Sequence, residues 1–267
     1  MQTIVTGTDF SKSSLNACAY AAMLADKYKC RLVLFNLLDV SWIHANSGLF
    51  LLETYRERRK NEHRIKKQLE DLKAAFPNME ITTFVNSGSF KKEIKKFTEH
   101  HQVKLIVMGL AEKNRFYKSI YGSHGVDIAG KLEAPVIIVP EQFKKHAIKH
   151  AVLAVDNSEK LHLSSLKEFE FLIKTIKPKV SVLHCRTKDE VFEPVKKVIK
   201  LNNVNHKIEE YTAKNLENGI EKFSKENQID LIAIISKKHS LFYNLFAESN
   251  TRQIAFDAKV PVMAIHE

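Results

Sequence analysis

The chain of 267 residues contains an internal repeat, because segments of its first half return in its second half in the same order. A repeat constrains the fold more than any single motif, since every copy must bury its own core, and about 130 residues suffice for one. We therefore expect two modules, at residues 1–143 and 149–267. The matching segments are 4–11 with 152–158, 31–36 with 179–184, 90–97 with 216–223, 103–109 with 229–236 and 134–139 with 260–265.

Short apolar segments alternate with segments of helical period in each copy. Residues 105–108 and 136–139 are continuously apolar, which is typical of strands buried on both faces of a parallel sheet. Ser11 is the expected cap of a helix that follows the first strand. The apolar face of that helix is expected at Leu15, Cys18, Ala19, Ala22 and Ala25. This order predicts an α/β fold of two repeated doubly wound modules, each with a mostly parallel five-stranded sheet flanked by helices.

The N-terminal sequence enters β-branched apolar residues at once, without the basic segment and cleavage site of a signal peptide. No segment approaches the roughly 20 apolar residues of a membrane span. The three cysteines, Cys18, Cys30 and Cys185, lack C-x-x-C spacing and are expected to be reduced and packed. We therefore expect a cytoplasmic protein that has no membrane partner.

The formal net charge is +11, and most of the excess lies in the first half of the chain. An anionic partner for that half is one interpretation. The basic runs at residues 56–60 and 91–96 are interleaved with glutamate rather than with aromatic residues, which favours solvated helix faces. Nucleic acid is therefore not expected as a partner.

Twelve histidines raise the question of a metal site, but no H-E-x-x-H motif and no Cys/His cluster of zinc spacing is present. His146 and His150 fall in the expected linker, and His100 and His101 end a basic helical segment, so all four are expected to be solvated. No G-x-S-x-G motif or cysteine with a suitable partner indicates covalent catalysis. We expect neither a metal nor a catalytic residue.

Doubly wound sheets bind ligands beyond the carboxyl ends of their strands, where the strand order reverses. Asp9 follows the first strand, and its carboxylate could accept hydrogen bonds from a ribose or a base amine. Gly109 follows residues 105–108 and would permit a sharp turn and close approach to a ligand. Gly122 and Ser123 begin a helical pattern, where free N–H groups and the helix dipole suit a phosphate. A capping aspartate, a glycine turn and a serine N-cap are the ordinary alternatives.

Residues 8–11 (Thr-Asp-Phe-Ser), 105–109, 122–123 (Gly-Ser) and 134–136 (Ala-Pro-Val) stand in the order and spacing of the universal stress protein family. The chain resembles a tandem form of that family over nearly its whole length. The resemblance implies that the first module alone binds ATP or AMP, with a role for Mg²⁺ left open. Asp9 and Leu37 would meet adenine and ribose, and residues 122–125 would face the phosphates. The implied nucleotide-binding residues are Thr8, Asp9, Leu37, Met108, Gly109, Gly122, Ser123, His124 and Gly125.

The chain departs from the family pattern at Glu112, which occupies the position of the second loop glycine. The second copy retains no loop glycine and carries Glu248 at the position of the phosphate turn, so we expect it to be mainly structural or to bind something other than a triphosphate. The function expected first is a cytosolic nucleotide-binding stress or regulatory protein without a dedicated reaction. One alternative is a nucleotide-free scaffold for dimerisation or interaction, in which the last strands pair the modules with each other or with a second chain as a homodimer. A weak ATPase is the third, although only Asp9 could serve as its base.

Overall fold

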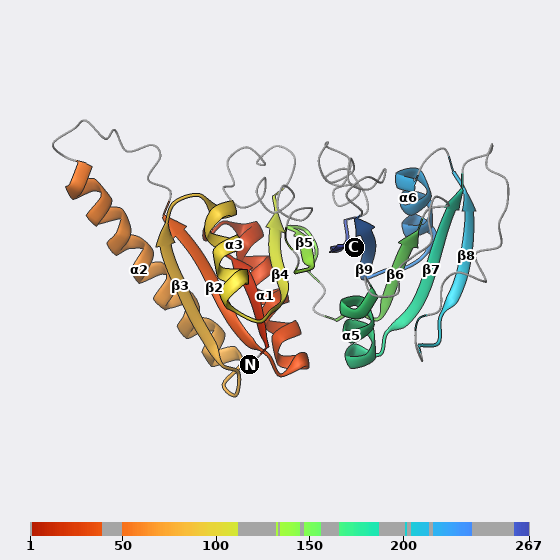
Figure 1. Ribbon diagram of the computed structural model, residues 1–267, viewed down its shortest axis with the longest axis horizontal. Coiled ribbons are helices and arrows are strands. Elements are labelled where there is room, and N and C mark those ends of the chain that lie inside the picture. The colour runs from red at the N-terminus through yellow and green to blue at the C-terminus, as the bar shows by residue number, and fades with distance from the viewer. Residues whose placement is uncertain are drawn as a thin grey trace.

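The strands in the described part of the chain form one ten-stranded sheet in the order β3-β2-β1-β4-β5-β10-β9-β6-β7-β8 (Figure 1). The computed structural model describes residues 2–38, 50–111, 132, 134–144, 147–155, 166–186, 201, 204–213, 216–236 and 259–266. The strands are β1 (Thr3–Gly7), β2 (Arg31–Leu38), β3 (Ile81–Ser87), β4 (Val103–Leu110), β5 (Val136–Pro140), β6 (His150–Val155), β7 (Lys179–Arg186), β8 (Lys207–Thr212), β9 (Leu231–Ser236) and β10 (Val262–His266). The helices within these residues are α1 (Lys12–Tyr28), α2 (Phe50–Ala75), α3 (Phe90–His100), α5 (Lys167–Ile176) and α6 (Leu216–Glu226).

The two halves of the sheet have the same topology. The first runs β3-β2-β1-β4-β5 and the second β8-β7-β6-β9-β10, and the strands within each half are parallel. The halves meet where β5 and β10 pair in antiparallel orientation, with Ile137 opposite Met263. This arrangement confirms the expected α/β fold of two doubly wound modules, and it joins both modules in a single sheet.

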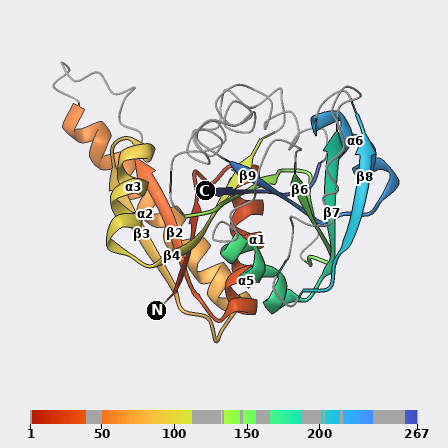
Figure 2. The same cartoon turned by 45° about the vertical axis from the view of Figure 1, so that its right-hand side comes forward.

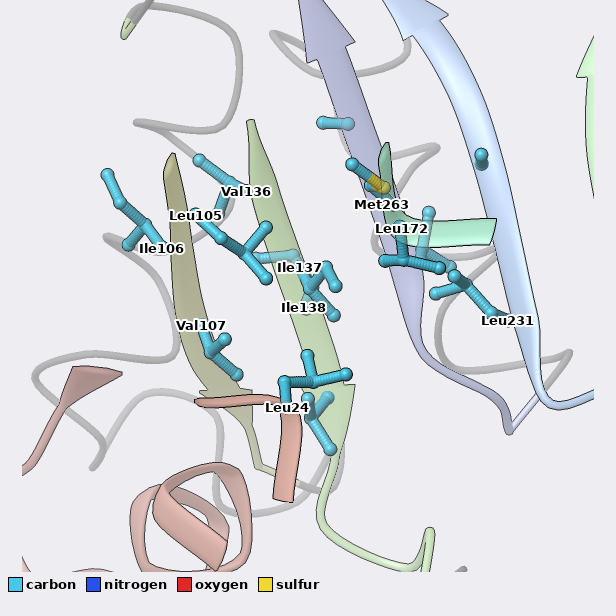
Figure 3. Close-up of a cluster of buried hydrophobic side chains, with 14 of the residues drawn as sticks. Leu24, Leu105, Ile106, Val107, Val136, Ile137, Ile138, Leu172, Leu231 and Met263 are labelled. Atoms are coloured by element: carbon cyan, nitrogen blue, oxygen red, sulfur yellow. The ribbon is translucent and has the colours of Figure 1, made fainter. Parts of the chain in front are cut away.

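Apolar strands at the centre of the sheet supply much of the core. β4 is buried from Leu105 onward and β5 along its whole length, as their continuous apolar sequence predicts (Figure 3). In the first half, α3 buries Phe90, Ile94 and Phe97, the triple that recurs in the second copy. Two of these rings pack edge-on against Phe35 of β2 with centroid separations of 5.6 Å, so helical spacing identified this contact face correctly.

The prediction for the first helix is correct at its start and partly wrong for its apolar face. Ser11 caps α1 and accepts a hydrogen bond from the Ser14 amide at 3.2 Å. Leu15, however, is 44% exposed, whereas the neighbouring Asn16 and Ala17 are buried. The reason is that α1 packs on β1, β2, β4 and β5 and also contacts α5 of the second half (Figure 2). These five described elements cover more of the helix than the single apolar stripe that its sequence suggests.

His150 corrects the expectation of a solvated linker histidine. It begins β6, is 6% exposed, and its Nε2 lies 2.8 Å from the hydroxyl of Ser181. Burial lowers the pKa of its imidazole below the usual value, so the ring is neutral at pH 7. His100 and His101 are exposed as expected, and His146 lies outside the described residues.

The cysteines and the basic runs agree with their sequence-based interpretation. Cys18, Cys30 and Cys185 are free and buried. The basic runs of α2 and α3 lie largely exposed and form ion pairs along their own helices, such as Lys60 with Glu57 at 2.6 Å. Among the helices in the described part of the chain, none combines the length and the apolar character that crossing a membrane requires.

Candidate functional site

Strand β1 ends at the point where the strand order of the first half reverses, with β2 on one side of it and β4 on the other. The carboxyl ends of β1, β2 and β4 therefore form one edge of the sheet, which we call the carboxyl edge. Thr8 and Asp9 follow β1, Leu37 lies near the end of β2, and Met108 and Gly109 lie near the end of β4. The topology thus brings five of the nine implied nucleotide-binding residues to the same edge.

The other implied residues, Gly122, Ser123, His124 and Gly125, lie outside the described residues, as does Glu112. The same holds for Asp156 and for Glu248 of the second copy. The proposed phosphate turn therefore stays a prediction of the sequence.

Thr8 is fully buried and its polar groups are used within the protein. Its hydroxyl donates to Oε1 of Gln68 at 3.0 Å and accepts from the Phe10 amide at 3.3 Å. Its carbonyl accepts from the side-chain amide of Asn36 at 2.8 Å. Asn61 of α2 donates in turn to Asn36 at 3.1 Å. Thr8 therefore anchors α2 to the end of β1 through hydrogen bonds within the protein.

Asp9 is partly exposed and lies in a tight turn between β1 and α1. Its Oδ1 accepts a hydrogen bond from the Ser11 amide at 3.0 Å, and its own amide donates to the Ser14 hydroxyl at 3.4 Å. Phe10, between Asp9 and Ser11, has a φ of +63°, a left-handed conformation that is unusual for a bulky side chain. The guanidinium of Arg64 lies 4.2 Å from the centre of the Phe10 ring, and this cation–π contact helps to hold the turn.

Leu37, Met108 and Gly109 give the carboxyl edge apolar walls. Leu37 is 6% exposed and Met108 is fully buried, so Met108 could meet a ligand only through its main chain. Packing requires a glycine at position 109, because a Cβ there would lie 2.5 Å from the carbonyl carbon of Ser13 and 2.8 Å from the Ser14 amide nitrogen. The glycine thus lets α1 approach β4, whereas the sequence suggested a sharp turn toward a ligand.

Sequence reasoning missed the polar side chains that support this edge: Asn36, Asn61, Arg64 and Gln68. One of them left a signal, since Asn36 is the polar interruption of the apolar run 32–38 and proves to be buried. A polar residue in such a strand needs an internal partner. The α2 residues carried no comparable signal, because polar residues are ordinary on a largely exposed helix.

The thiol nearest to this edge is not a nucleophile. Cys18 of α1 is buried beside Thr6, with 3.6 Å between its sulfur and the Thr6 hydroxyl. Burial raises the pKa of the Cys18 thiol to about 11, so it stays protonated at neutral pH. Within the described ranges, no three His, Cys, Asp or Glu side chains converge in a way that could hold a metal ion.

The arrangement defines the class of the protein, a tandem doubly wound α/β protein with a polar turn at its strand-order reversal. The sequence model of the universal stress protein family matches residues 1–140, and the chain belongs to that family. A search of the curated proteins found no match.

Solved structures resemble the whole chain in fold. A universal stress protein from Archaeoglobus fulgidus DSM 4304 is 14% identical, with a TM-score of 0.70 over 99% of this chain and 96% of that one. A putative universal stress protein from Pseudomonas aeruginosa UCBPP-PA14 is 13% identical, with a TM-score of 0.56 over 99% and 92%. The cytoplasmic domain of a prokaryotic cation chloride cotransporter is 10% identical, with a TM-score of 0.51 over 99% and 94%. Likeness at these identities establishes the fold, and the function must be argued from the site.

Proposed function

We propose that the chain is a cytosolic regulatory protein that binds ATP or AMP at the carboxyl edge of its first module and has no dedicated reaction. The observation that carries the proposal is the convergence of Asp9, Leu37 and Gly109 from three neighbouring strands at the strand-order reversal. Family membership supports the same conclusion.

The residues at the edge fit part of a nucleotide. The partly exposed carboxylate of Asp9 suits the hydroxyls of a ribose or the amine of a base, and Leu37 supplies an apolar surface beside it. The phosphates of the nucleotide would bind to residues 122–125, as the resemblance to the family pattern implies. A nucleotide that prefers one conformation of this edge would shift the population of the protein toward it, which is how a ligand regulates without being consumed.

Calorimetric titration of the full chain with Mg-ATP, and separately with AMP, tests the proposal. Asp9→Asn keeps the oxygen that accepts from the Ser11 amide, so the turn should survive while nucleotide affinity falls about tenfold. Asp156→Asn changes the corresponding residue of the second copy and is the matched control, with affinity expected to be unchanged. Gly122→Glu should abolish binding by placing an anion in the phosphate turn.

Three outcomes would overturn parts of the proposal. The absence of both heat and a thermal shift at millimolar nucleotide would exclude nucleotide binding. Unchanged affinity in Gly122→Glu would remove the assigned phosphate turn. Release of ADP by the unmodified chain, lost in that variant, would instead establish an ATPase.

A nucleotide-free scaffold is the second candidate, and the hydrogen bonds of the carboxyl edge favour it. The Thr8 hydroxyl, the Thr8 carbonyl and the Asn36 side chain are already hydrogen-bonded there within the protein, whereas the buried Nε2 of Gln68 has no partner among the described residues. A homodimer would have to use a surface other than β5 and β10, because both strands already pair on both of their edges. Light scattering of the purified chain with and without nucleotide separates the candidates: a nucleotide-independent dimer that shows no heat of binding would favour the scaffold.

A further inference from the structure

A cavity of about 260 Å³ lies where the two modules meet, at the amino-terminal part of β1 and β4 and therefore away from the carboxyl edge. Ile4 of β1 and Leu105 of β4 line it from the first module, and Leu172 of α5 and Met263 of β10 line it from the second. Figure 3 shows Leu172 beside Met263 in this region. Both modules thus contribute to one apolar chamber, which the nucleotide proposal does not use.

An aromatic pair from the two modules forms part of the cavity wall. Tyr28, at the end of α1, stacks on Phe171 of α5 with ring centroids 5.0 Å apart and an angle of 20° between the planes. Both residues line the cavity, and Phe171 is 40% exposed. The stack therefore extends from the chamber to the surface, where a ligand could enter.

The chamber has polar groups on its lining that lack partners. The hydroxyl of Tyr28 is buried and forms no hydrogen bond with any described residue. Such a group costs free energy unless something bonds to it. Lys104 and Lys167 also line the cavity, are exposed, and form no ion pair within the described part of the chain. One carboxylate, that of Glu168, is present, so the ionised groups of the lining sum to one positive charge.

The charge of Lys104 also acts on another residue of the cavity lining. Cys30 also lines the cavity, and although burial raises the pKa of its thiol, the charge of Lys104 opposes that rise. A cation that acts on a buried thiol in this lining can also act on a ligand that occupies the chamber.

We propose that this chamber binds a small amphiphilic monocarboxylate, with its aliphatic chain among Ile4, Leu105 and Met263 and its carboxylate at the Tyr28 hydroxyl and the two lysines. The cavity volume equals that of about nine water molecules, so a ligand of about nine or ten non-hydrogen atoms would fill it. Because the lining comes from both modules, this ligand stabilises the contact between α1 and α5. It binds independently of any nucleotide.

Titration of the full chain with octanoate, followed by calorimetry, tests the proposal. Octanoate should bind saturably, octanol should bind about tenfold more weakly because it lacks the charge, and acetate should not bind because it lacks the chain. Tyr28→Phe should weaken octanoate binding about tenfold without harming the fold, since it removes a hydroxyl that has no partner. Tyr20→Phe is the matched control: its hydroxyl is also buried and unpartnered among the described residues, but Tyr20 does not line the cavity.

Charge reversal provides a second test on exposed residues that should not affect folding. The double variant Lys104→Glu with Lys167→Glu should weaken octanoate binding by at least about tenfold, and Lys91→Glu on α3 should leave it unchanged. Equal affinities for octanoate and octanol, or equal effects of Tyr28→Phe and Tyr20→Phe, would overturn the assigned ligand. Absence of saturable octanoate binding would overturn the site, and neither result would bear on nucleotide binding at the carboxyl edge.

Discussion

Replacement of Gly109 by alanine tests how closely α1 approaches β4. The added Cβ would lie 2.5 Å from the carbonyl carbon of Ser13, 2.8 Å from the amide nitrogen of Ser14, and closer still to the Ser13 carbonyl oxygen. Carbon contacts are most favourable at about 3.5–4.0 Å, so the first turn of α1 would have to retreat by about 1 Å. The atoms concerned belong to the backbone, so no side-chain rotation can relieve the overlap.

The cost follows from two opposing effects. Overpacking of a well-filled interior costs about 1–3 kcal/mol, and a clash with backbone belongs at the upper end of that range. Alanine also restricts the unfolded chain, which returns about 0.4–1 kcal/mol. We expect a net loss of about 2 kcal/mol in the free energy of unfolding, equivalent to about 4–8 °C in Tm for a chain of this size.

Urea denaturation followed by circular dichroism measures this loss. Gly88→Ala is the matched control, because its φ of +124° is strained for alanine while the nearest atom to its added Cβ, at 3.9 Å, leaves room. The control should lose about 1 kcal/mol through backbone strain alone. If Gly109→Ala lost less than the control, the packing explanation of Gly109 would be refuted, and its identity would have to come from a ligand.

Three further predictions concern the rest of the fold. Gly219→Ala should lose about 2 kcal/mol of unfolding free energy in urea titrations, because its added Cβ would overlap the sulfur of Cys185. The second change Cys185→Ala should recover most of that loss. Destabilisations that simply add in the double variant would contradict the overlap. Burial holds the pKa of His150 in the folded state below its unfolded value near 6.5, so its contribution to stability is present above that pH and falls as the pH drops toward 5. Urea midpoints measured at pH 7, 6 and 5 should therefore fall less steeply with decreasing pH in His150→Gln than in the unmodified chain. Parallel pH dependences of the two midpoints would refute this contribution. The side-chain amide of Asn16 donates to the carbonyls of Pro140 and Phe143 at 3.1 and 2.8 Å. Asn16→Ala should therefore lower the free energy of unfolding by about 1–3 kcal/mol in the same assay. A change below about 0.5 kcal/mol would exclude a structural role for these two hydrogen bonds.

The sequence was most informative where the pattern of apolar residues alone decides burial. The repeat predicted that both halves are copies of one doubly wound module, and the spacing of Phe90, Ile94 and Phe97 located the buried face of α3. Helical period was less informative for α1, where contacts with several elements leave Leu15 exposed and bury Asn16. Periodicity indicates that a helix has a buried side, but not how many neighbours cover it.

The sequence predicted where the candidate site lies, but it predicted the roles of the individual residues less well. Strand ends and glycines placed Asp9 and Gly109 at the carboxyl edge, but the role of Gly109 depends on the approach of α1, which no local pattern encodes. His150 was misassigned for a related reason: its imidazole is buried and bonds to Ser181, a residue 31 positions away in the chain. Interactions between distant segments decide both cases.

The antiparallel pairing of β5 with β10 covers a strand edge in each half and thereby protects both halves from aggregation. Exposed strand edges invite pairing with other chains. Each half covers one such edge of the other, so a fragment cut after residue 143 would expose the edge of β5 and should self-associate through it. The outer strands of the whole sheet are β3 and β8, and β8 carries Lys207, Glu209 and Glu210, charges of the kind that discourage further pairing. The tandem arrangement thus does within one chain what a dimer would do between two, at every protein concentration.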